Sequence, residues 1–417
     1  MEKLQAIKGT YDILPGEAEL WQYVEGVIRE ICKDAGFGEI RIPVFERTEL
    51  FSRGVGDTTD VVQKEMYTFE DKGKRSLTLR PEGTAGVVRS VLEHSVLAGA
   101  LPVKLYYLIT CYRNEKPQAG RFREFRQFGV EAFGSMDPAL DAEIISLAVS
   151  LMSRLGLTGL KVNINSIGCP VCRKKYNGAL RAFLEQNLDG LCGTCKTRYE
   201  KNPLRILDCK EEACKKITEN APVMTEYLCD ECRQHFEGLQ NDLKLMDIQY
   251  EIDPKIVRGL DYYTKTVFEI TSDSLGAQST VCGGGRYDGL VEELGGSATP
   301  GIGFGLGLER LLLCMKAQGI PLPNHTRPKL FICELGDAAR AYGIKLVNQL
   351  RNQGISVLHD YMGRGLKGQM KYADKTGAEY CIVLGDSEIE SGTCALKHME
   401  SGESREIQLE LLKEALS

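Results

Sequence analysis

A stretch rich in arginines, aromatic residues and carboxylates between Tyr112 and Glu131 carries the strongest chemical signal in the sequence. Two segments of strand character flank a Lys-Pro-Gln-Ala-Gly turn there, which predicts an antiparallel hairpin. Arg113 and Arg121 offer planar guanidinium groups to phosphate, and Phe125 offers an aromatic face to a purine. An exposed hairpin whose arginines pair with surface carboxylates explains the same residues equally well.

A second arginine signal lies in IVRGLDYYTKTVFEI, which predicts an apolar strand. Arg258 stands just before Tyr262 and Tyr263, and burying an arginine among apolar residues is costly unless it meets an anion. An edge-strand arginine beside core tyrosines is the alternative interpretation.

Two other segments place a charged residue beside a strand end. In GFGLGLERLLL the glycines permit close backbone approach, and Arg310 lies on the first turns of a predicted helix. In TLRPEGTAG, Glu82 follows a predicted strand and could hold an ammonium group. Glycine packing with a surface arginine, and an acid that complements a helix dipole, are the respective alternatives. No GxxxxGK[ST] loop occurs, so side chains would have to bind any phosphates.

Eight of the 15 cysteines lie in an apparent insertion over about residues 169–240. Their spacing fits four-thiolate zinc sites built from cysteine pairs that are consecutive in the chain. The first set is Cys169, Cys172, Cys192 and Cys195, and the second could be Cys209, Cys214, Cys229 and Cys232. Reduced thiols packed in a small helical module are the alternative.

The length of 417 residues predicts more than one domain. Three prolines in QGIPLPNHTRP indicate a linker, so we expect domains at 1–325 and 326–417, the second with alternating strands and helices. The N-terminus lacks the pattern of an export signal and no apolar run is long enough for a membrane span, which predicts a cytoplasmic protein with reduced thiols. The net charge of −6 says little about nucleic acid.

Taken together, these motifs resemble the histidine-tRNA ligases, which are class II aminoacyl-tRNA synthetases. The resemblance rests on PVFERTELF, TLRPEGT, YRNEKPQAGRFREF with GVEAFG, IVRGLDYYT, GGGRYDGLV and GLGLER, in that order. It implies an α+β fold: an antiparallel β-sheet catalytic core flanked by helices, a cysteine-rich insertion, and a C-terminal α/β anticodon-binding domain.

The resemblance also implies a reaction in two steps. The histidine carboxylate attacks the α-phosphate of ATP, which is accompanied by Mg²⁺, to give histidyl-adenylate and pyrophosphate. A ribose hydroxyl at the 3′ end of tRNA(His) then takes the histidyl group, and AMP is released. Arg113 and Arg258 would be the catalytic cations on opposite sides of the α-phosphate. The implied ATP-binding residues are Arg113, Glu115, Arg121, Phe125 and Arg310. The implied histidine-binding residues are Glu82, Gly83, Thr84, Arg113, Gln127, Glu131, Arg258, Tyr262, Tyr263 and Tyr287.

Other partners follow from the same resemblance. The turn with Gln118 is similar to the loop that reads the extra guanosine at the tRNA acceptor end, and a homodimer would form through the segment around PVFERTELF. Structural Zn²⁺ stays open, because these enzymes do not depend on an insertion metal for chemistry and many lack the cysteines.

Two alternatives to such a ligase are considered. A catalytically inactive paralogue that regulates histidine biosynthesis predicts degraded arginines and a missing anticodon domain, whereas the arginines are present and about ninety residues follow the linker. A pure RNA-binding or zinc-dependent interaction module would not need the pocket formed by Glu82, Glu131 and Tyr263.

Overall fold

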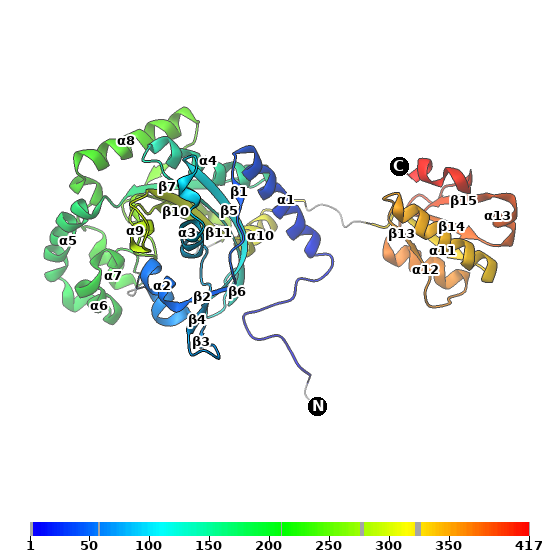
Figure 1. The fold of residues 1–417 in the computed structure, drawn as a ribbon, viewed down its shortest axis with the longest axis horizontal. Helices are drawn as coiled ribbons and strands as arrows, with labels where there is room; N and C mark the ends of the chain where they lie inside the picture. Colours follow the sequence, from blue (N-terminus) through cyan, green and yellow to red (C-terminus); the bar gives the residue numbers. More distant parts are fainter. Residues whose placement is uncertain (1–2, 57–58, 210, 276–278, 322–326, 417) are drawn as a thin grey trace. The chain divides into compact units, whose positions relative to one another are not determined.

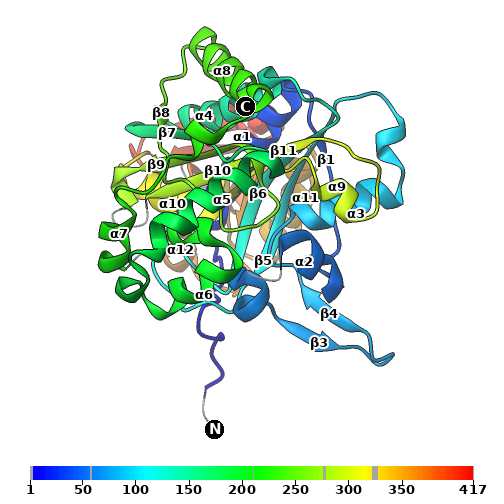
Figure 2. The ribbon, with the colours of Figure 1, turned by 90° about the vertical axis from the view of Figure 1, so that its left-hand side faces the viewer.

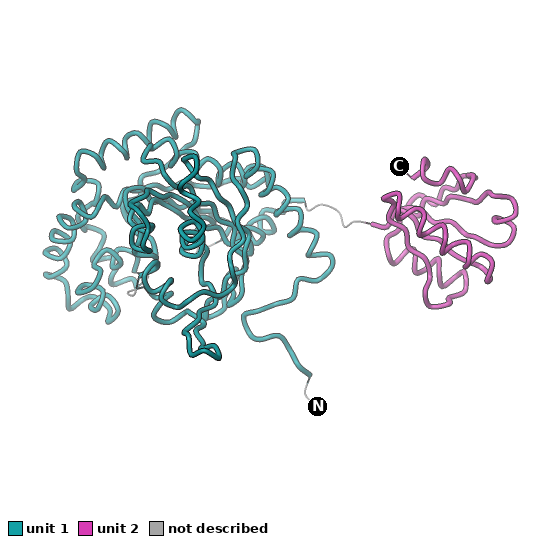
Figure 3. Tube along the Cα trace, viewed as in Figure 1, with its two compact units in different colours: residues 1–321 teal, residues 322–417 magenta. Residues whose placement is uncertain are grey.

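The chain divides into two compact units, Met1–Pro321 and Leu322–Ser417 (Figure 3). The computed structural model describes residues 3–56, 59–209, 211–275, 279–321 and 327–416. The boundary predicted between residues 325 and 326 lies outside these described residues. Each unit is described by itself below.

An eight-stranded sheet forms the centre of the first unit (Figure 1). Its six middle strands pair antiparallel, and parallel pairs occur only where the short strands β1 and β8 join the two edges. In spatial order the strands are β1 (Gly38–Glu39), β5 (Val103–Tyr112), β6 (Glu124–Phe133), β11 (Gly301–Gly307), β10 (Thr280–Arg286), β9 (Thr264–Ser272), β7 (Leu160–Ser166) and β8 (Glu251–Ile252). The predicted α+β class with an antiparallel central sheet is therefore confirmed, as is the hairpin formed by β5 and β6.

The two faces of this sheet differ in what covers them. Phe128 and Val130 join the larger core, which packs against α1 (Ala18–Asp34), α4 (Pro138–Arg154) and α10 (Leu308–Ala317). Because side chains alternate along a strand, Gln127 and Glu131 point to the opposite face. That face is only partly covered, by α3 (Thr84–Glu93) and α9 (Leu290–Glu293), which leaves room there for a site.

A smaller sheet and an insertion flank the main one. Strands β2 (Phe45–Arg47), β4 (Ser76–Leu79) and β3 (Thr68–Glu70) form the small sheet, and β3 and β4 project as a hairpin (Figure 2). Between β7 and β8 the chain forms α5 (Pro170–Glu185), α6 (Gly193–Lys201), α7 (Glu212–Thr218) and α8 (Asp230–Leu245). These helices share an apolar core of their own, as the predicted inserted unit requires.

The second unit has a five-stranded sheet in the order β13-β12-β14-β15-β16. Its bounds are β13 (Val357–His359), β12 (Leu330–Glu334), β14 (Tyr380–Leu384), β15 (Thr393–His398) and β16 (Ser404–Gln408). The first three strands are parallel and are connected through α11 (Asp337–Asn352) and α12 (Leu366–Thr376), so the predicted α/β character is confirmed. Among the described residues, no helix has the length and apolar character that crossing a membrane requires.

A buried ionic network joins the insertion to the main sheet. Arg286 of β10 donates from Nε to Asp141 Oδ2 on α4 at 3.1 Å, and its Nη2 forms an ion pair of 2.6 Å with Asp141 Oδ1. His235 of α8 lies 2.9 Å from the same carboxylate. Burial alone would raise the pKa of Asp141, but the hydrogen bond from His235 and the charge of Arg286 lower it overall. The carboxylate therefore stays ionised with no exposure to solvent.

Replacing Asp141 should destabilise the protein far more than replacing an exposed acid. Asp141→Ala would leave the fully buried Arg286 guanidinium with Asp288, 3.3 Å away, as its remaining acidic partner, and breaking a buried ion pair costs up to about 3–5 kcal/mol. Asp34→Ala is the matched control, because the Arg154–Asp34 pair is 49% and 60% exposed and such pairs contribute about 0–1 kcal/mol. Urea unfolding of the two variants measures both losses, and equal losses would contradict the role of this network.

Candidate active site

A cavity of about 480 Å³ opens on the partly covered face of the central sheet. Strands β6, β10 and β11, the segment before β9, and the insertion all supply residues to its wall. The sequence-predicted residues on the wall are Glu82, Thr84, Arg113, Glu115, Arg121, Phe125, Gln127, Arg258, Tyr262, Tyr263 and Arg310. Glu131 and Tyr287 are only 1% exposed and lie behind the wall. Gln118 lies in the turn of the β5–β6 hairpin, where it bridges to Arg121.

The hairpin places a guanidinium beside an aromatic ring. Arg113 donates from Nε to the Pro81 carbonyl at 2.8 Å, and its guanidinium carbon lies 5.3 Å from the centre of the Phe125 ring. Arg121 is 46% exposed and forms an ion pair of 3.4 Å with Glu115. This end of the cavity therefore combines a flat aromatic surface with two cations, which suits a nucleotide with its phosphates.

Glu82 lies both at the start of a helix and in the cavity wall. Its carboxylate accepts hydrogen bonds from the backbone N–H groups of Thr84 and Ala85, at 2.7 and 2.9 Å, where α3 begins. It is therefore an acid at a helix start, where its negative charge complements the helix dipole. It also lines the cavity while only 2% exposed, so the same bonds fix a carboxylate in the site.

Glu131 is held by three hydroxyl groups. Thr84 Oγ1 donates to it at 2.7 Å, the Tyr107 hydroxyl lies at 3.2 Å, and the Tyr287 hydroxyl donates to its other oxygen. Burial raises the pKa of Glu131 to about 8, despite these hydrogen bonds. A carboxyl group with a pKa near neutral is therefore buried next to Thr84, which lines the cavity.

Arg258 lies in a loop, although the sequence predicted a strand there. The residues from Arg258 to Tyr263 do not belong to a strand, because β9 begins only at Thr264. The loop is anchored instead by other parts of the chain: the Gly259 carbonyl accepts from Arg205 of the insertion.

The surroundings of Arg258 fix its charge in the cavity. It pairs with Glu269 of β9, whose other oxygen accepts from the Thr280 hydroxyl at 2.8 Å. Its guanidinium carbon lies 5.9 Å from the centre of the Tyr263 ring. Burial would lower the pKa of Arg258, but the charge of Glu269 raises it overall, so the arginine stays cationic.

Arg310 lies on the first turn of α10, as predicted, and donates to the Thr280 carbonyl at 2.9 Å. Burial, followed by the positive charge of Arg121, lowers the pKa of Arg310. Two like charges that face the same cavity favour an anion between them.

Several wall residues were missed by sequence analysis. Glu269 is one, although a single carboxylate in the apolar strand TVFEI was an available signal. Arg198, Arg205 and Asp208 reach the cavity from the insertion, whose sequence lacks a periodic pattern to indicate it.

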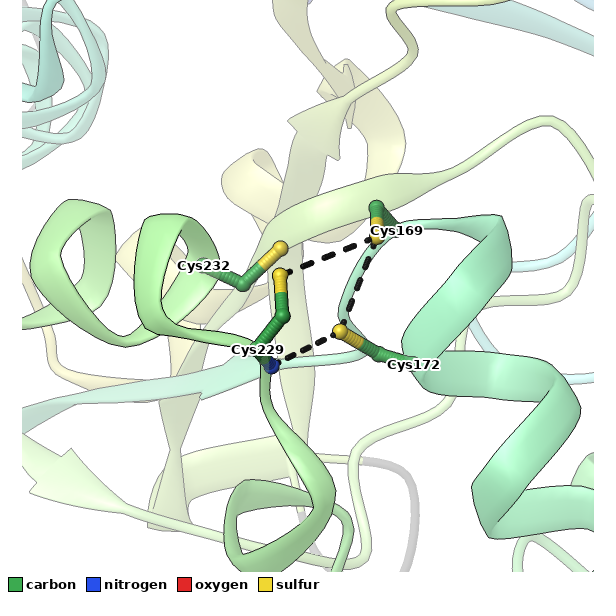
Figure 4. A group of neighbouring side chains, drawn as sticks. All are labelled: Cys169, Cys172, Cys229 and Cys232. Carbon is green, nitrogen blue, oxygen red and sulfur yellow. Dashed lines mark hydrogen bonds between the residues drawn. The ribbon is translucent and has the colours of Figure 1, made fainter.

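The cysteines of the insertion are grouped differently from the sequence expectation. Consecutive pairs do not combine. The structure assembles Cys169, Cys172, Cys229 and Cys232 in one group and Cys192, Cys195, Cys209 and Cys214 in the other. The second group thus lies within the chain loop that the first one closes, because the starts of α5 and α8 meet at the first group and bring the ends of the insertion together (Figure 4).

Comparisons with known proteins agree on one family. A family model described as "Histidyl-tRNA synthetase" matches residues 9–311, and one described as "Anticodon binding domain" matches residues 320–417. The chain belongs to the histidyl-tRNA synthetase family. The enzyme is thus a histidine-tRNA ligase, which activates histidine with ATP and transfers it to tRNA.

Individual relatives match over nearly their whole length. A histidine–tRNA ligase from Acetivibrio thermocellus is 62% identical over 98% of both chains, and one from Caldanaerobacter subterraneus subsp. tengcongensis is 55% identical over 99% of both. The crystal structure of apo Staphylococcus aureus histidyl-tRNA synthetase is 41% identical with a TM-score of 0.86, and the match covers 99% of this chain and 100% of that one. The match to the anticodon-binding family removes the main argument for a regulatory paralogue without that domain.

Protonation of Glu131 should give this synthetase a specific dependence of stability on pH. Because its pKa rises from 4.5 to about 8 on folding, the folded state binds more protons between these values. The free energy of unfolding should therefore fall as pH rises from about 4.5 to 8, and Glu131→Gln should flatten that slope. Urea unfolding across this range measures it, with Glu25→Gln on the surface of α1 as control. An unchanged slope in Glu131→Gln would contradict the raised pKa.

Proposed function

We propose that the cavity forms histidyl-adenylate, with Arg113 and Arg258 as the catalytic cations. The observation that carries the proposal is the convergence of four arginines from three separate stretches of chain on one cavity: Arg113, Arg121, Arg258 and Arg310. Opposite them, buried carboxylates and tyrosines provide the groups that an amino acid with an ammonium group and an imidazole would need.

The chemistry of the first step explains why cations dominate. The attacking histidine carboxylate is already ionised, so the step needs no general base. Negative charge builds up on the α-phosphate in the transition state, and fixed cations stabilise it without reorganising. In this proposal Arg113 and Arg258 contact the α-phosphate, Arg121 and Arg310 contact the distal phosphates, and Phe125 stacks on adenine.

Histidine would lie against the floor of the cavity. Glu82, Thr84 and Gln127 would receive its ammonium group, with Gly83 permitting close approach. Glu131 and the Tyr263 hydroxyl would contact the two imidazole nitrogens. Tyr262 supports this arrangement because its ring centre lies 4.6 Å from that of Tyr263 and 5.6 Å from that of Tyr287, forming one aromatic cluster behind the substrate. A buried polar pair of this kind rejects amino acids that would leave it unpaired.

The carboxylates beside the phosphate end fit magnesium. Glu65 and Glu115 both line the cavity near Arg113 and Arg121, and carboxylate oxygens are the ligands that Mg²⁺ prefers. Burial raises the pKa of Glu65, and the neighbouring charge of Glu115 contributes to the rise, so a cation here would relieve their repulsion. When bound, Mg²⁺ would offset the charge of the pyrophosphate group. We also expect structural zinc in the insertion, whose thiols are the soft ligands that this metal accepts.

The tRNA contacts are assigned by position. Gln118 at the turn of the hairpin would contact the acceptor end of tRNA(His), close to the site of transfer. The segment 326–417 would form the anticodon-binding domain and 1–325 the catalytic domain with its insertion. Unpaired anticodon bases can be read by stacking and by hydrogen bonds to their edges.

Assembly and location complete the proposal. A homodimer through PVFERTELF is supported by exposed apolar residues there: Val44 is 43% and Phe45 is 52% exposed, and Phe69, 44% exposed, lies beside Phe45. A group of neighbouring exposed apolar residues marks an interaction surface more often than a single exposed apolar residue does. A cytoplasmic location fits the fifteen cysteines, all of them free thiols.

Exchange between ATP and labelled pyrophosphate, measured with each of the twenty amino acids, tests the site directly. We expect exchange with histidine alone, followed by charging of tRNA(His) and of no other tRNA. Exchange with a different amino acid, or none at all, would refute the assignment of the pocket.

Arg258→Lys should slow turnover more than it weakens histidine binding. A lysine keeps the charge but loses the planar fork, so kcat for exchange should fall by roughly 10- to 100-fold. The KM for histidine should change by less than about threefold. Arg29→Lys, on the exposed side of α1, serves as control. A rise in KM at unchanged kcat would assign Arg258 to substrate binding instead.

Gly283→Ala offers a way to displace Arg258 without changing its charge. A methyl group at this position would overlap the Arg258 guanidinium, which is the movable end of a flexible side chain. The fold should therefore tolerate the change, while exchange falls by up to about 100-fold because the cation is misplaced. Gly178→Ala in α5, where a methyl group meets nothing within 4 Å, is the matched control. Full activity in Gly283→Ala would contradict the catalytic placement of Arg258.

A further inference from the structure

Four sulfur atoms converge at the base of the insertion. Cys169 and Cys172 come from the start of α5, and Cys229 and Cys232 from the start of α8 (Figure 4). The sulfur atom of Cys169 lies 3.6 Å from that of Cys172 and 4.0 Å from that of Cys229. Four thiolates around zinc at about 2.3 Å lie about 3.8 Å apart, and both of these distances are close to that value.

A second group of the same form lies at the far end of the insertion. Cys192 and Cys195 flank the start of α6, and the sulfur of Cys192 lies 3.9 Å from that of Cys209. Cys214 completes the set, and all four sulfur atoms lie within 4.8 Å of one another. Both groups therefore offer four sulfur ligands and no other donor type, which selects zinc over magnesium or calcium.

Backbone donors are directed at sulfur in both groups. The N–H of Cys229 donates to Cys172 Sγ at 3.1 Å, and the N–H of Cys192 donates to Cys214 Sγ at 3.3 Å. Hydrogen bonds of this kind favour thiolate over thiol and are typical partners of metal ligands. The equivalent bond recurs in two groups with different chain spacing, which packing of neutral thiols does not require.

The cysteines outside the insertion provide a comparison within the same chain. They are buried and serve as ordinary core residues: Cys32, Cys111, Cys282, Cys314, Cys333, Cys381 and Cys394. Among them Cys333 and Cys381 approach to 3.6 Å, but they form only a pair beside a methionine. Sets of four thus distinguish the insertion from simple thiol packing.

Residues beside the two groups contact different segments near the active site. In the turn between Cys229 and Cys232, Glu231 pairs with Lys265 at 2.8 Å, two residues after Tyr263. At the far group, the segment between Cys195 and Cys209 carries the side chains that reach the cavity.

Contacts of that far segment reach the Arg258 loop. Arg198 pairs with Asp60 at 3.2 Å, Asn202 donates to Asp261 at 3.0 Å, and Arg205 donates to the Gly259 carbonyl. The loop that carries Arg258 is therefore braced by residues whose own positions depend on the far cysteine group.

We propose that the insertion holds two structural zinc ions in nested sites, one closing its base and the other fixing the wall segment that braces the Arg258 loop. Each ion would add cross-links to a module whose own apolar core is small. This inference adds the number and arrangement of the zinc ions to the structural zinc of the proposed function. The expected effect on ATP–pyrophosphate exchange rests on the proposed active site.

Metal analysis of the full-length protein, purified without oxygen or chelator, tests the number of ions. We expect two zinc ions per chain, and X-ray absorption should show four sulfur neighbours at about 2.3 Å around each. One zinc or none per chain, or thiols oxidised to disulfides, would overturn the proposal. This measurement needs no variant, so it decides even if the variants fold poorly.

Double variants distinguish nested from consecutive pairing. Nested sites predict that Cys169→Ser/Cys229→Ser retains one zinc, whereas Cys169→Ser/Cys192→Ser damages both sites and retains none. Consecutive sites predict the reverse. Cys32→Ser/Cys394→Ser, which alters two buried core thiols, should keep two and controls for loss of cysteine. Retention of one zinc by Cys169→Ser/Cys192→Ser would refute the nested arrangement.

Loss of the far site should also lower histidine-dependent exchange. In Cys192→Ser/Cys209→Ser we expect kcat to fall at least tenfold, with one zinc retained at the base. Full exchange after loss of the far zinc would refute the proposed bracing of the Arg258 loop and leave the active-site assignment intact. Absence of exchange in a wild-type protein that holds two zinc ions would refute the active-site assignment alone.

Discussion

Room for charged side chains on the central sheet is the constraint on which the rest of the site depends. Strands β10 and β11 pair Gly283 with Gly305, so these two positions of the sheet carry no side chains where they line the cavity. A methyl group at Gly283 would overlap Arg258, and one at Gly305 would overlap Gln127. Glycine in a strand normally weakens it, and close approach of another group is the usual compensation. The two glycines therefore leave room over the sheet for the Arg258 guanidinium and the Gln127 amide.

The polar groups that occupy this space are fixed before any substrate arrives. Glu82 is held by the backbone at the start of α3, Glu131 by hydroxyl groups, and Arg258 by Glu269. Each buried charge thus has partners, which limits the cost of removing it from water. The same bonds fix the direction of each group, and a preorganised site spends little free energy on rearrangement during the reaction. Stability of the apo site and its readiness for catalysis have the same physical origin.

Local pattern was enough to predict the elements that carry the site. Helix α4 begins at Pro138 with Asp137 as its cap, and the β5–β6 hairpin forms where alternation and a turn required it. The loop at Tyr262 and Tyr263 was predicted wrongly as strand, because aromatic residues favour strands only where a neighbour pairs with them. Here the insertion anchors the backbone instead, through Arg205, which no local pattern could indicate.

The cysteine groups also show that local sequence pattern does not indicate contacts between distant parts of the chain. Spacing identified the eight candidate ligands but grouped them with the wrong partners. A short separation in sequence reduces the entropy of closing a loop without deciding which loops close. Packing of α8 on α4, through His235 and Asp141, brings residues 60 apart in sequence into one group. The base of the insertion is thus determined by contacts with the main sheet. The remaining four cysteines lie between these ends in the sequence and can group only with one another. A nested arrangement follows.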